Sequence, residues 1–286
     1  MPSLIDIRRR IRSVKNTQQI TKAMKMVSAA KLRRAQDRVI ASRPYAAMLR
    51  KMLENVAAAV AGDEQAGQNP LLAQRAEQRI LLVLITSDKG LAGAFNANLI
   101  KGAQRFIAEH GGAAVRLELI GRKGRDFFRK HRAEIAGEHV GLAAKVVYAD
   151  LAAIARKAMD LYSNEEIDAV YVLYNGFKSV VAQTLTLTRV LPVEVRRREE
   201  RVDYIFEPPP RELLNALLPR YVELEFYRAL AESTAAEHAA RMTAMEAATS
   251  NAGEMIDRLT LYMNRVRQAS ITKEIIEVVS GAAAAE

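Results

Sequence analysis

The chain has 286 residues, with 43 Lys or Arg against 33 Asp or Glu, and a formal net charge of +10. Half of the residues are apolar, so the chain can bury a core, yet no apolar run approaches the roughly 18 residues that a membrane span needs. The absence of cysteine excludes disulfides, thiol nucleophiles and zinc–thiolate sites, and it fits a reducing cytoplasmic setting. The basic N-terminus lacks the apolar segment of a secretory signal, which predicts a soluble or peripheral protein.

Both ends of the chain are almost free of the residues that interrupt helices. Ser3–Ala61 contains no glycine and one proline, Pro44, and Arg220–Ser280 contains no proline and one glycine, Gly253. Helices of this length would each extend about 90 Å, which exceeds the diameter of a compact domain. The sequence therefore predicts that the two terminal helices pair as an antiparallel coiled coil, because a lone helix could not bury its apolar stripe.

Apolar residues along these helices recur at coiled-coil spacing. In the first helix, Leu4, Ile7, Ile11 and Val14 form one series, after which we expect the register to shift to Thr17, Ile20, Met24 and Val27. In the second helix the series is His238, Met242, Met245, Thr249, Ala252, Ile256, Leu259, Met263 and Val266. Its central residues are small, which predicts a close-packed but weakly held pair.

The first helix is also strongly basic. Residues 1–51 hold fourteen Lys or Arg against two Asp, a net charge of +12. Such a concentration favours an anionic partner, which could be nucleic acid, lipid headgroups or an acidic protein surface. A basic coiled-coil protein that binds nucleic acid is thus one alternative, although the apolar stripe through Ile7, Ile11 and Val14 is already needed by a partner helix.

The middle of the chain alternates between strand and helix patterns. We expect strands at Ile80–Thr86, Val115–Ile120, Asp168–Tyr174 and Val180–Val190, and helices at Leu91–His110, Gly124–Arg132 and Ala149–Tyr162. This alternation predicts a Rossmann-like α/β domain with a mostly parallel sheet and a final antiparallel hairpin that turns after Asn175 and Gly176. The expected fold is therefore α/β plus a long antiparallel coiled coil, with a first helix at 1–61, the α/β domain at 75–200 and the last helix at 208–286. Pro219 predicts a kink or a short separate turn at the start of the last helix.

Catalytic patterns are weak. The turns Ser87–Gly93 and Gly121–Gly124 lie where phosphate loops occur in α/β folds, but neither matches a phosphate-binding motif, which favours structural turns. The four histidines have no shared helical spacing that would hold a metal. No nucleophile, base and orienting acid group together, so the sequence predicts a protein that is not an enzyme.

Two longer motifs point to a family. The segment 271–284, ITKEIIEVVSGAAA, and the segment 7–27, IRRRIRSVKNTQQITKAMKMV, resemble the two ends of the γ subunit of F-type ATP synthases, and 87–96 and 241–251 extend the likeness. The lack of cysteine and of a transit peptide resembles the bacterial form of the family and differs from the redox-regulated chloroplast form. The chain departs from the family pattern at Glu225, where glutamine is expected, which puts contacts there in doubt.

The resemblance implies a rotor shaft. In this family one γ subunit per complex penetrates the α3β3 hexamer and contacts the ε subunit and the c-ring of Fo, so that proton flow turns the shaft and drives ATP synthesis. Mg-ATP and Mg-ADP bind to α and β, which implies no cofactor and no catalytic group in this chain. The resemblance further implies a peripheral protein on the cytoplasmic side of the cell inner membrane, with no nucleic-acid partner.

Specific contacts follow from the same resemblance. It implies that Lys22, Met24 and Lys25 lie near an acidic loop of β, and that Arg267, Gln268, Thr272 and Glu274 form a second β contact. It also implies that the apolar tail Ile271–Val279 inserts into a bearing formed by the hexamer.

Overall fold

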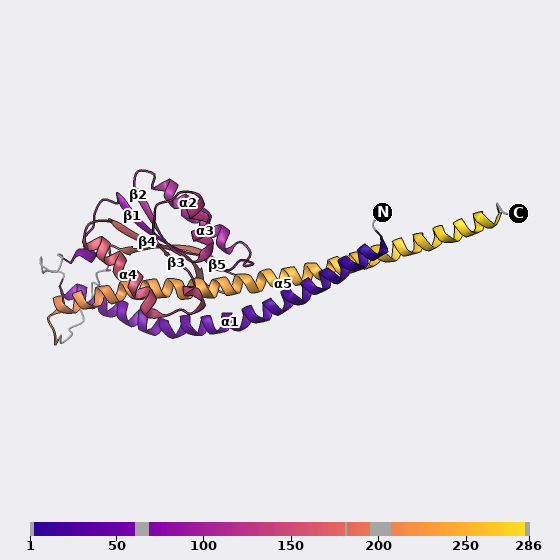
Figure 1. Ribbon diagram of the computed structural model, residues 1–286. Coiled ribbons are helices and arrows are strands. Elements are labelled where there is room, and N and C mark those ends of the chain that lie inside the picture. Colours follow the sequence, from indigo (N-terminus) through magenta and orange to yellow (C-terminus); the bar gives the residue numbers. More distant parts are fainter. Residues whose placement is uncertain (1–2, 61–68, 181, 195–206, 284–286) are drawn as a thin grey trace. The chain divides into compact units, whose positions relative to one another are not determined.

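The computed structural model describes residues 3–60, 69–180, 182–194 and 207–283. These residues form two compact units, one made of Met1–Ser28 with Met242–Glu286 and the other of Ala29–Arg241. Two long helices, α1 (Leu4–Ala59) and α5 (Pro210–Ala283), contribute to both units (Figure 1). The boundaries expected at 61 and 200 lie outside the described residues.

The second unit contains one five-stranded sheet in the order β3-β2-β1-β4-β5. Its strands are β1 (Arg79–Ile85), β2 (Ala114–Ile120), β3 (Ile135–His139), β4 (Ala169–Phe177) and β5 (Gln183–Leu191). β1 to β4 pair in parallel and β5 pairs antiparallel with β4, which confirms the predicted parallel sheet with an antiparallel edge. β3 was not predicted, because its short IAGEH sequence carries a glycine and two polar residues and is only half-buried.

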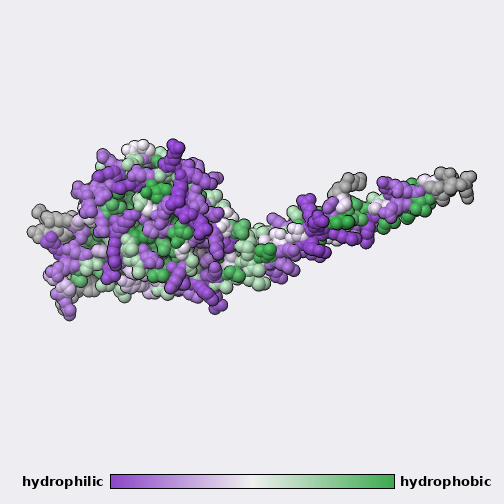
Figure 2. Space-filling view, in the orientation of Figure 1, coloured by the Kyte–Doolittle hydropathy of each residue, from purple (hydrophilic) through white to green (hydrophobic). Residues whose placement is uncertain are grey.

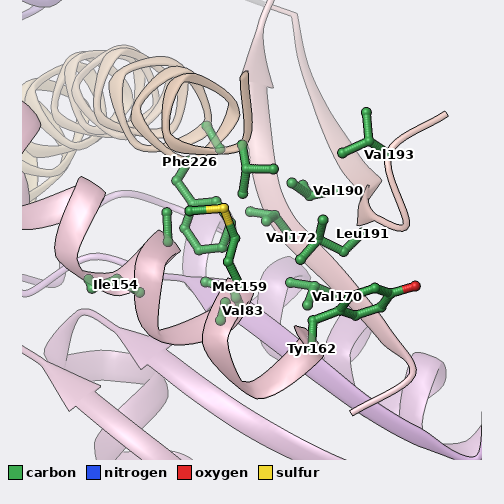
Figure 3. Packing of buried hydrophobic residues seen from close by; sticks show 14 of the residues in the cluster. Val83, Ile154, Met159, Tyr162, Val170, Val172, Val190, Leu191, Val193 and Phe226 are labelled. Carbon is green, nitrogen blue, oxygen red and sulfur yellow. The ribbon is translucent and has the colours of Figure 1, made fainter. Parts of the chain in front are cut away.

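Helices cover both faces of this sheet. α2 (Phe95–Glu109) and α3 (Arg122–Lys130) bury Leu99 and Phe128 against one face. α4 (Tyr148–Ser163) covers the other face together with parts of α1 and α5, and Figure 3 shows Phe226 of α5 among the strand residues Val83, Val170 and Val172. Two short 3₁₀ helices, η2 (Pro70–Leu72) and η3 (Leu142–Ala144), complete the unit. Because β1 is buried on both faces, its continuous apolar sequence is what a central parallel strand requires.

Two local expectations for this unit are wrong. α2 begins at Phe95 and not at Leu91, because Leu91 (φ 64°) and Gly93 (φ 56°) adopt the left-handed conformation, which a helix cannot continue. The hairpin turns after Lys178, where the Ser179 N–H donates to the Ala182 carbonyl (3.0 Å), so Asn175 and Gly176 lie inside β4.

Of the two outcomes expected at Pro219, a kink or a short separate turn, the separate turn does not form. α5 is assigned as one helix through this proline. Its first turns are held by the core, where Leu214, Leu218 and Val222 are buried, and this packing outweighs the hydrogen bond that proline removes.

In the first unit, α1 and α5 pair as antiparallel helices. Thr21 Oγ1 lies 2.8 Å from Thr249 Oγ1, Gln18 donates to the Thr249 carbonyl (3.4 Å), and Lys25 forms an ion pair with Glu246. Residues later in α1 contact residues earlier in α5, so the two helices run in opposite directions. This confirms the predicted antiparallel pairing. The predicted seam of α5 from Met242 to Val266 is also confirmed, since its members are buried or half-buried.

The register shift predicted for α1 is wrong. Ile20 is 60% exposed and Val27 is 55% exposed, so neither belongs to the seam. Apart from half-buried Met24, the buried and half-buried positions instead keep one spacing of three and four residues, with polar side chains in its middle. The seam residues from 4 to 28 are Leu4, Ile7, Ile11, Val14, Gln18, Thr21, Lys25 and Ser28.

Candidate partner-binding surfaces

The end of α5 extends past the start of α1 within the first unit (Figure 1). The Thr21–Thr249 and Lys25–Glu246 contacts place Leu4 opposite the turn near Val266. From there α5 continues to Ala283, which adds about 25 Å of helix without α1 beside it. Residues 271–280 are all exposed, so this segment, the free end of α5, buries nothing within the chain.

The free end carries its apolar side chains on one broad face. Ile275, Ile276 and Val279 are 57%, 58% and 61% exposed, and Val278 is 72% exposed. In Figure 2, hydrophobic surface lies on α5 beside the grey C-terminal residues. A broad apolar face needs a partner that covers it, and the opposite side of the free end carries Lys273, Glu274 and Glu277.

The predicted second contact lies at the base of this free end. Arg267, Gln268, Thr272 and Glu274 are exposed. Thr272 Oγ1 donates to the Gln268 carbonyl (2.9 Å), and Ser270 Oγ donates to Glu274 Oε1 (3.1 Å). These bonds remain within α5, so the Arg267 guanidinium and the Gln268 amide keep their side chains available to a partner.

The predicted first contact lies in a polar groove between α1 and α5. The groove has a volume of about 500 Å³ and is lined by Gln18, Gln19, Lys22, Lys25, Glu246, Thr249, Ser250 and Gly253. Lys22 is exposed, whereas Lys25 is half-buried and forms an ion pair with Glu246. Met24 is half-buried and does not line the groove, and its carbonyl accepts from Ser28 Oγ (2.7 Å). The structure therefore brings Lys22 and Lys25 together and places the second group roughly 30 Å farther along the helix pair.

Residues that the sequence reasoning missed are the polar members of the seam, Gln18, Thr21 and Ser28. Their hydroxyl and amide groups find partners within the helix pair, as in the bond from Thr21 Oγ1 to the Gln18 carbonyl (3.0 Å). Continuing the spacing of Leu4, Ile7, Ile11 and Val14 without regard to polarity would have found them.

Two buried carboxylates of α5 are held by basic and phenolic partners in the second unit. Glu225, where the resemblance led us to expect glutamine, is 6% exposed and pairs with Arg228 (3.0 Å) and Arg50 (3.5 Å). Glu223 accepts from Tyr148 (2.7 Å) and Arg156 (2.8 Å), and burial together with this bond raises the pKa of Tyr148 to about 12. The contacts around Glu225 are thus internal ion pairs that join α5 to α1.

The described residues offer little that could hold a metal or cross a membrane. Among them, no three His, Cys, Asp or Glu side chains are grouped so that they could hold a metal ion. Within the same residues, no helix is long and apolar enough to span a membrane.

Comparisons with known proteins agree with this architecture. The sequence model of a family described as ATP synthase matches residues 3–285. The chain is 75% identical to the ATP synthase gamma chain of Solibacter usitatus over 286 residues, covering 100% of both chains, and 51% identical to that of an Anaeromyxobacter species, covering 99% of both.

Solved structures with similar folds come from ATP synthases. A chain from the central stalk and c-ring structure of the Tetrahymena thermophila mitochondrial enzyme has a TM-score of 0.63 and 29% identity, with 80% of this chain and 99% of that chain covered. A chain from the Euglena gracilis mitochondrial enzyme in rotational state 3 has a TM-score of 0.69 and 19% identity, with 98% and 94% covered, and it supports the fold alone. These relatives give no support to the nucleic-acid-binding alternative. The 75% identity over the full length of the chain, together with the family model that matches residues 3–285, shows that the chain belongs to the ATP synthase gamma chain family.

Proposed function

We propose that this chain is the central rotor shaft of an ATP synthase, which couples proton flow through the membrane c-ring to ATP synthesis and hydrolysis in the α3β3 hexamer. One copy serves each complex, and it contacts the ε subunit, the c-ring and the hexamer. The chain is peripheral on the cytoplasmic side of the inner membrane. It carries torque and contributes no catalytic group, because Mg-ATP binds to the α and β subunits.

The observation that carries this proposal is the free end of α5. Its side chains Ile275, Ile276 and Val278 are exposed in the chain alone, and burying a side chain of this kind contributes about 1.5–3 kcal/mol. Several such residues on one broad helix face fit the apolar wall of a sleeve in which the helix turns. A hexamer with a central opening provides such a sleeve.

The two groups of contact residues suit a shaft that is gripped at two heights. The groove at Lys22 and Lys25 presents positive charge, which matches an acidic loop of β. The group from Arg267 to Glu274 presents charge and hydrogen-bonding side chains next to the apolar end. Separate grips along one axis support transfer of torque, since a single contact point would allow the shaft to tilt.

The proposal is tested by substituting Met24→Lys in the assembled ATP synthase. A lysine at this half-buried position adds charge beside the groove, where it would attract the acidic loop of β and hold the shaft. We expect a severalfold loss of ATP-driven proton pumping relative to ATP hydrolysis, with assembly unchanged. Pumping is measured in inverted membrane vesicles, and hydrolysis is measured in the same preparation.

Met26→Lys is the matched control, because Met26 is 61% exposed and lies on a different face of α1. It makes the same chemical change and should leave the ratio of pumping to hydrolysis unchanged. Normal coupling in the Met24→Lys enzyme would contradict the proposed β contact, and equal losses in both variants would show an effect of charge on α1 in general.

A further inference from the structure

The second unit contains a basic pocket that the proposed shaft function does not use. It has a volume of about 200 Å³. α1, the turn after β1, η3 and α5 form its walls. The lining residues are Lys31, Arg34, Ala35, Arg38, Asp88, Lys89, Ala143, Ala144, Thr234, Glu237, His238 and Arg241.

Three basic side chains of the pocket come from one face of α1. Lys31, Arg34 and Arg38 are spaced by three and four residues, which places them on neighbouring turns of the same face. All three are exposed, and within the described part of the chain none of them has a hydrogen-bond or ion-pair partner. Like charges so close repel one another, so an anion that they share would remove a cost as well as add contacts.

The acidic side chains of the pocket are already engaged by the fold. Asp88 accepts from the backbone N–H groups of Arg122 (3.0 Å) and Gly141 (3.0 Å). Glu237 accepts from Arg241 Nη2 (2.6 Å). The pocket has five Lys or Arg side chains and only these two carboxylates, so its net charge is positive.

Arg241 forms a fixed floor for the pocket. It is 8% exposed, and its guanidinium donates to the carbonyl of Gly90 (3.2 Å and 3.3 Å) and approaches that of Lys89 (3.4 Å). These bonds hold the turn after β1 against α5, so the backbone around Lys89 is positioned before any ligand arrives. Positioning of this kind lowers the entropy cost of binding.

The pocket also lies where doubly wound sheets place their ligands. Asp88 and Lys89 follow the carboxyl end of β1, and Ala143 and Ala144 follow the carboxyl end of β3. His238 reports the local potential, because burial and then the charges of Arg241 and Lys31 lower its pKa to about 4.

We propose that this pocket binds a small phosphate-class polyanion, such as a phosphate group or a short polyphosphate chain. The Lys31 ammonium, the Arg34 and Arg38 guanidinium groups and the Lys89 ammonium surround the anion from two elements. The volume is below the roughly 300–1,000 Å³ of sites for drug-sized ligands, which fits a compact phosphate chain better than a folded protein loop.

The test uses the full-length chain and inorganic tripolyphosphate, with His238 as the reporter. NMR of the imidazole resonances follows the four histidines through a pH titration. The charges of Lys31 and Arg241 around His238 stay in place, whereas Glu237, whose pKa is raised by burial, takes up a proton in the same range, so each titration is compared with one recorded without the anion. A bound polyanion places negative charge near the ring, so we expect the pKa of His238 to rise by about one or more, at constant ionic strength set by chloride.

Two pairs of substitutions locate the site. Arg34→Ala with Arg38→Ala removes two pocket cations and should weaken tripolyphosphate binding at least about tenfold, measured by calorimetry. Arg33→Ala with Lys51→Ala removes the same charge from exposed positions of α1 outside the pocket and should leave the affinity unchanged.

Three outcomes would overturn the proposal. The pKa of His238 could stay unchanged at saturating tripolyphosphate, or both pairs of substitutions could weaken binding equally, which would show diffuse attraction to a basic helix. A hexaglutamate peptide that binds more tightly than tripolyphosphate and displaces it would assign the pocket to an acidic protein segment. None of these results bears on the coupling measured with Met24→Lys, so the two proposals fail separately.

Discussion

At the scale of single residues, a buried carboxylate in the sheet explains an otherwise unexpected glycine. Glu118 of β2 is 1% exposed and accepts from Lys157 of α4 (3.0 Å) and lies 2.7 Å from His139 Nε2 of β3. Burial alone would raise the pKa of Glu118, but the hydrogen bonds from His139 and Lys157 outweigh it and lower the pKa. Gly137 pairs with Glu118 across the strands, and its missing side chain makes room for the carboxylate.

Gly137→Ala should therefore destabilise the second unit. The added Cβ would lie 2.2 Å from Glu118 Oε1, so the carboxylate must move away from Lys157 and His139. We expect a loss of about 1–3 kcal/mol in the free energy of unfolding, measured by urea denaturation. Gly112→Ala is the control, since nothing lies within 4 Å of its added Cβ. In a Glu118→Ala background the cost of Gly137→Ala should vanish, and a cost that persists there would place the strain elsewhere in β3.

At the scale of elements, the helix pair of the first unit keeps its spacing but not its apolar character. Gln18, Thr21 and Ser28 occupy α1 positions that a strong coiled coil would fill with leucine or isoleucine. Opposite them, Gly253 lets the Gln18 side chain lie across α5, with its Nε2 3.2 Å from the position of an added Cβ. The pair is thus defined by polar contacts and close approach more than by apolar burial.

Gly253→Ala should stabilise this pair. Alanine favours the helix by about 1 kcal/mol over glycine, and the only close contact is the end of the flexible Gln18 side chain, which can shift. We expect a gain of up to about 1 kcal/mol in unfolding experiments on the full chain, and the same gain in a Gln18→Ala background. A loss of stability that Gln18→Ala relieves would mean that the bond from Gln18 to the Thr249 carbonyl holds the register.

The helix pair also shows what the sequence could predict and why. Long tracts without glycine or proline predicted both helices, and the α5 seam from Met242 to Val266 followed from apolar spacing. The prediction of the α1 seam is wrong after Val14, because the exposed residues Ile20 and Val27 form a second apolar stripe. Hydropathy alone does not tell which of the two stripes faces α5. Likewise, β1 and β4 were predicted from their apolar runs, whereas β3 forms by pairing with β2 and has little pattern of its own.

At the scale of the whole molecule, the free end of α5 separates the stability of the chain from its function in a complex. Ending the chain after Ser270 should change the free energy of unfolding by no more than about 0.5 kcal/mol relative to the full-length chain, because residues 271–280 are all exposed. Thermal unfolding of both chains measures this difference. The same truncation should reduce ATP-driven proton pumping by the assembled enzyme.

The double substitution Ile275→Asp with Ile276→Asp should also reduce ATP-driven proton pumping, since it places charge in the apolar bearing. Full pumping by both variants would contradict the bearing.

The candidate contacts at this scale were predictable in part. The motifs at the two ends of the chain indicated the family, and the resemblance implied the groups around Lys22 and Arg267, which remain predictions. The basic pocket was not predictable, since it joins Lys31 and Arg34 of α1 to Lys89 and Arg241 from distant parts of the sequence. Only folding brings these charges to one place.

The pairing offset between α1 and α5 also determines where the shaft is elastically soft. Up to about Val266, two packed helices share any twisting load, whereas the remainder of α5 resists alone. Angular strain under load therefore accumulates first in the unpaired segment. In a record of rotation, a probe attached there would lag behind a probe attached to the paired region.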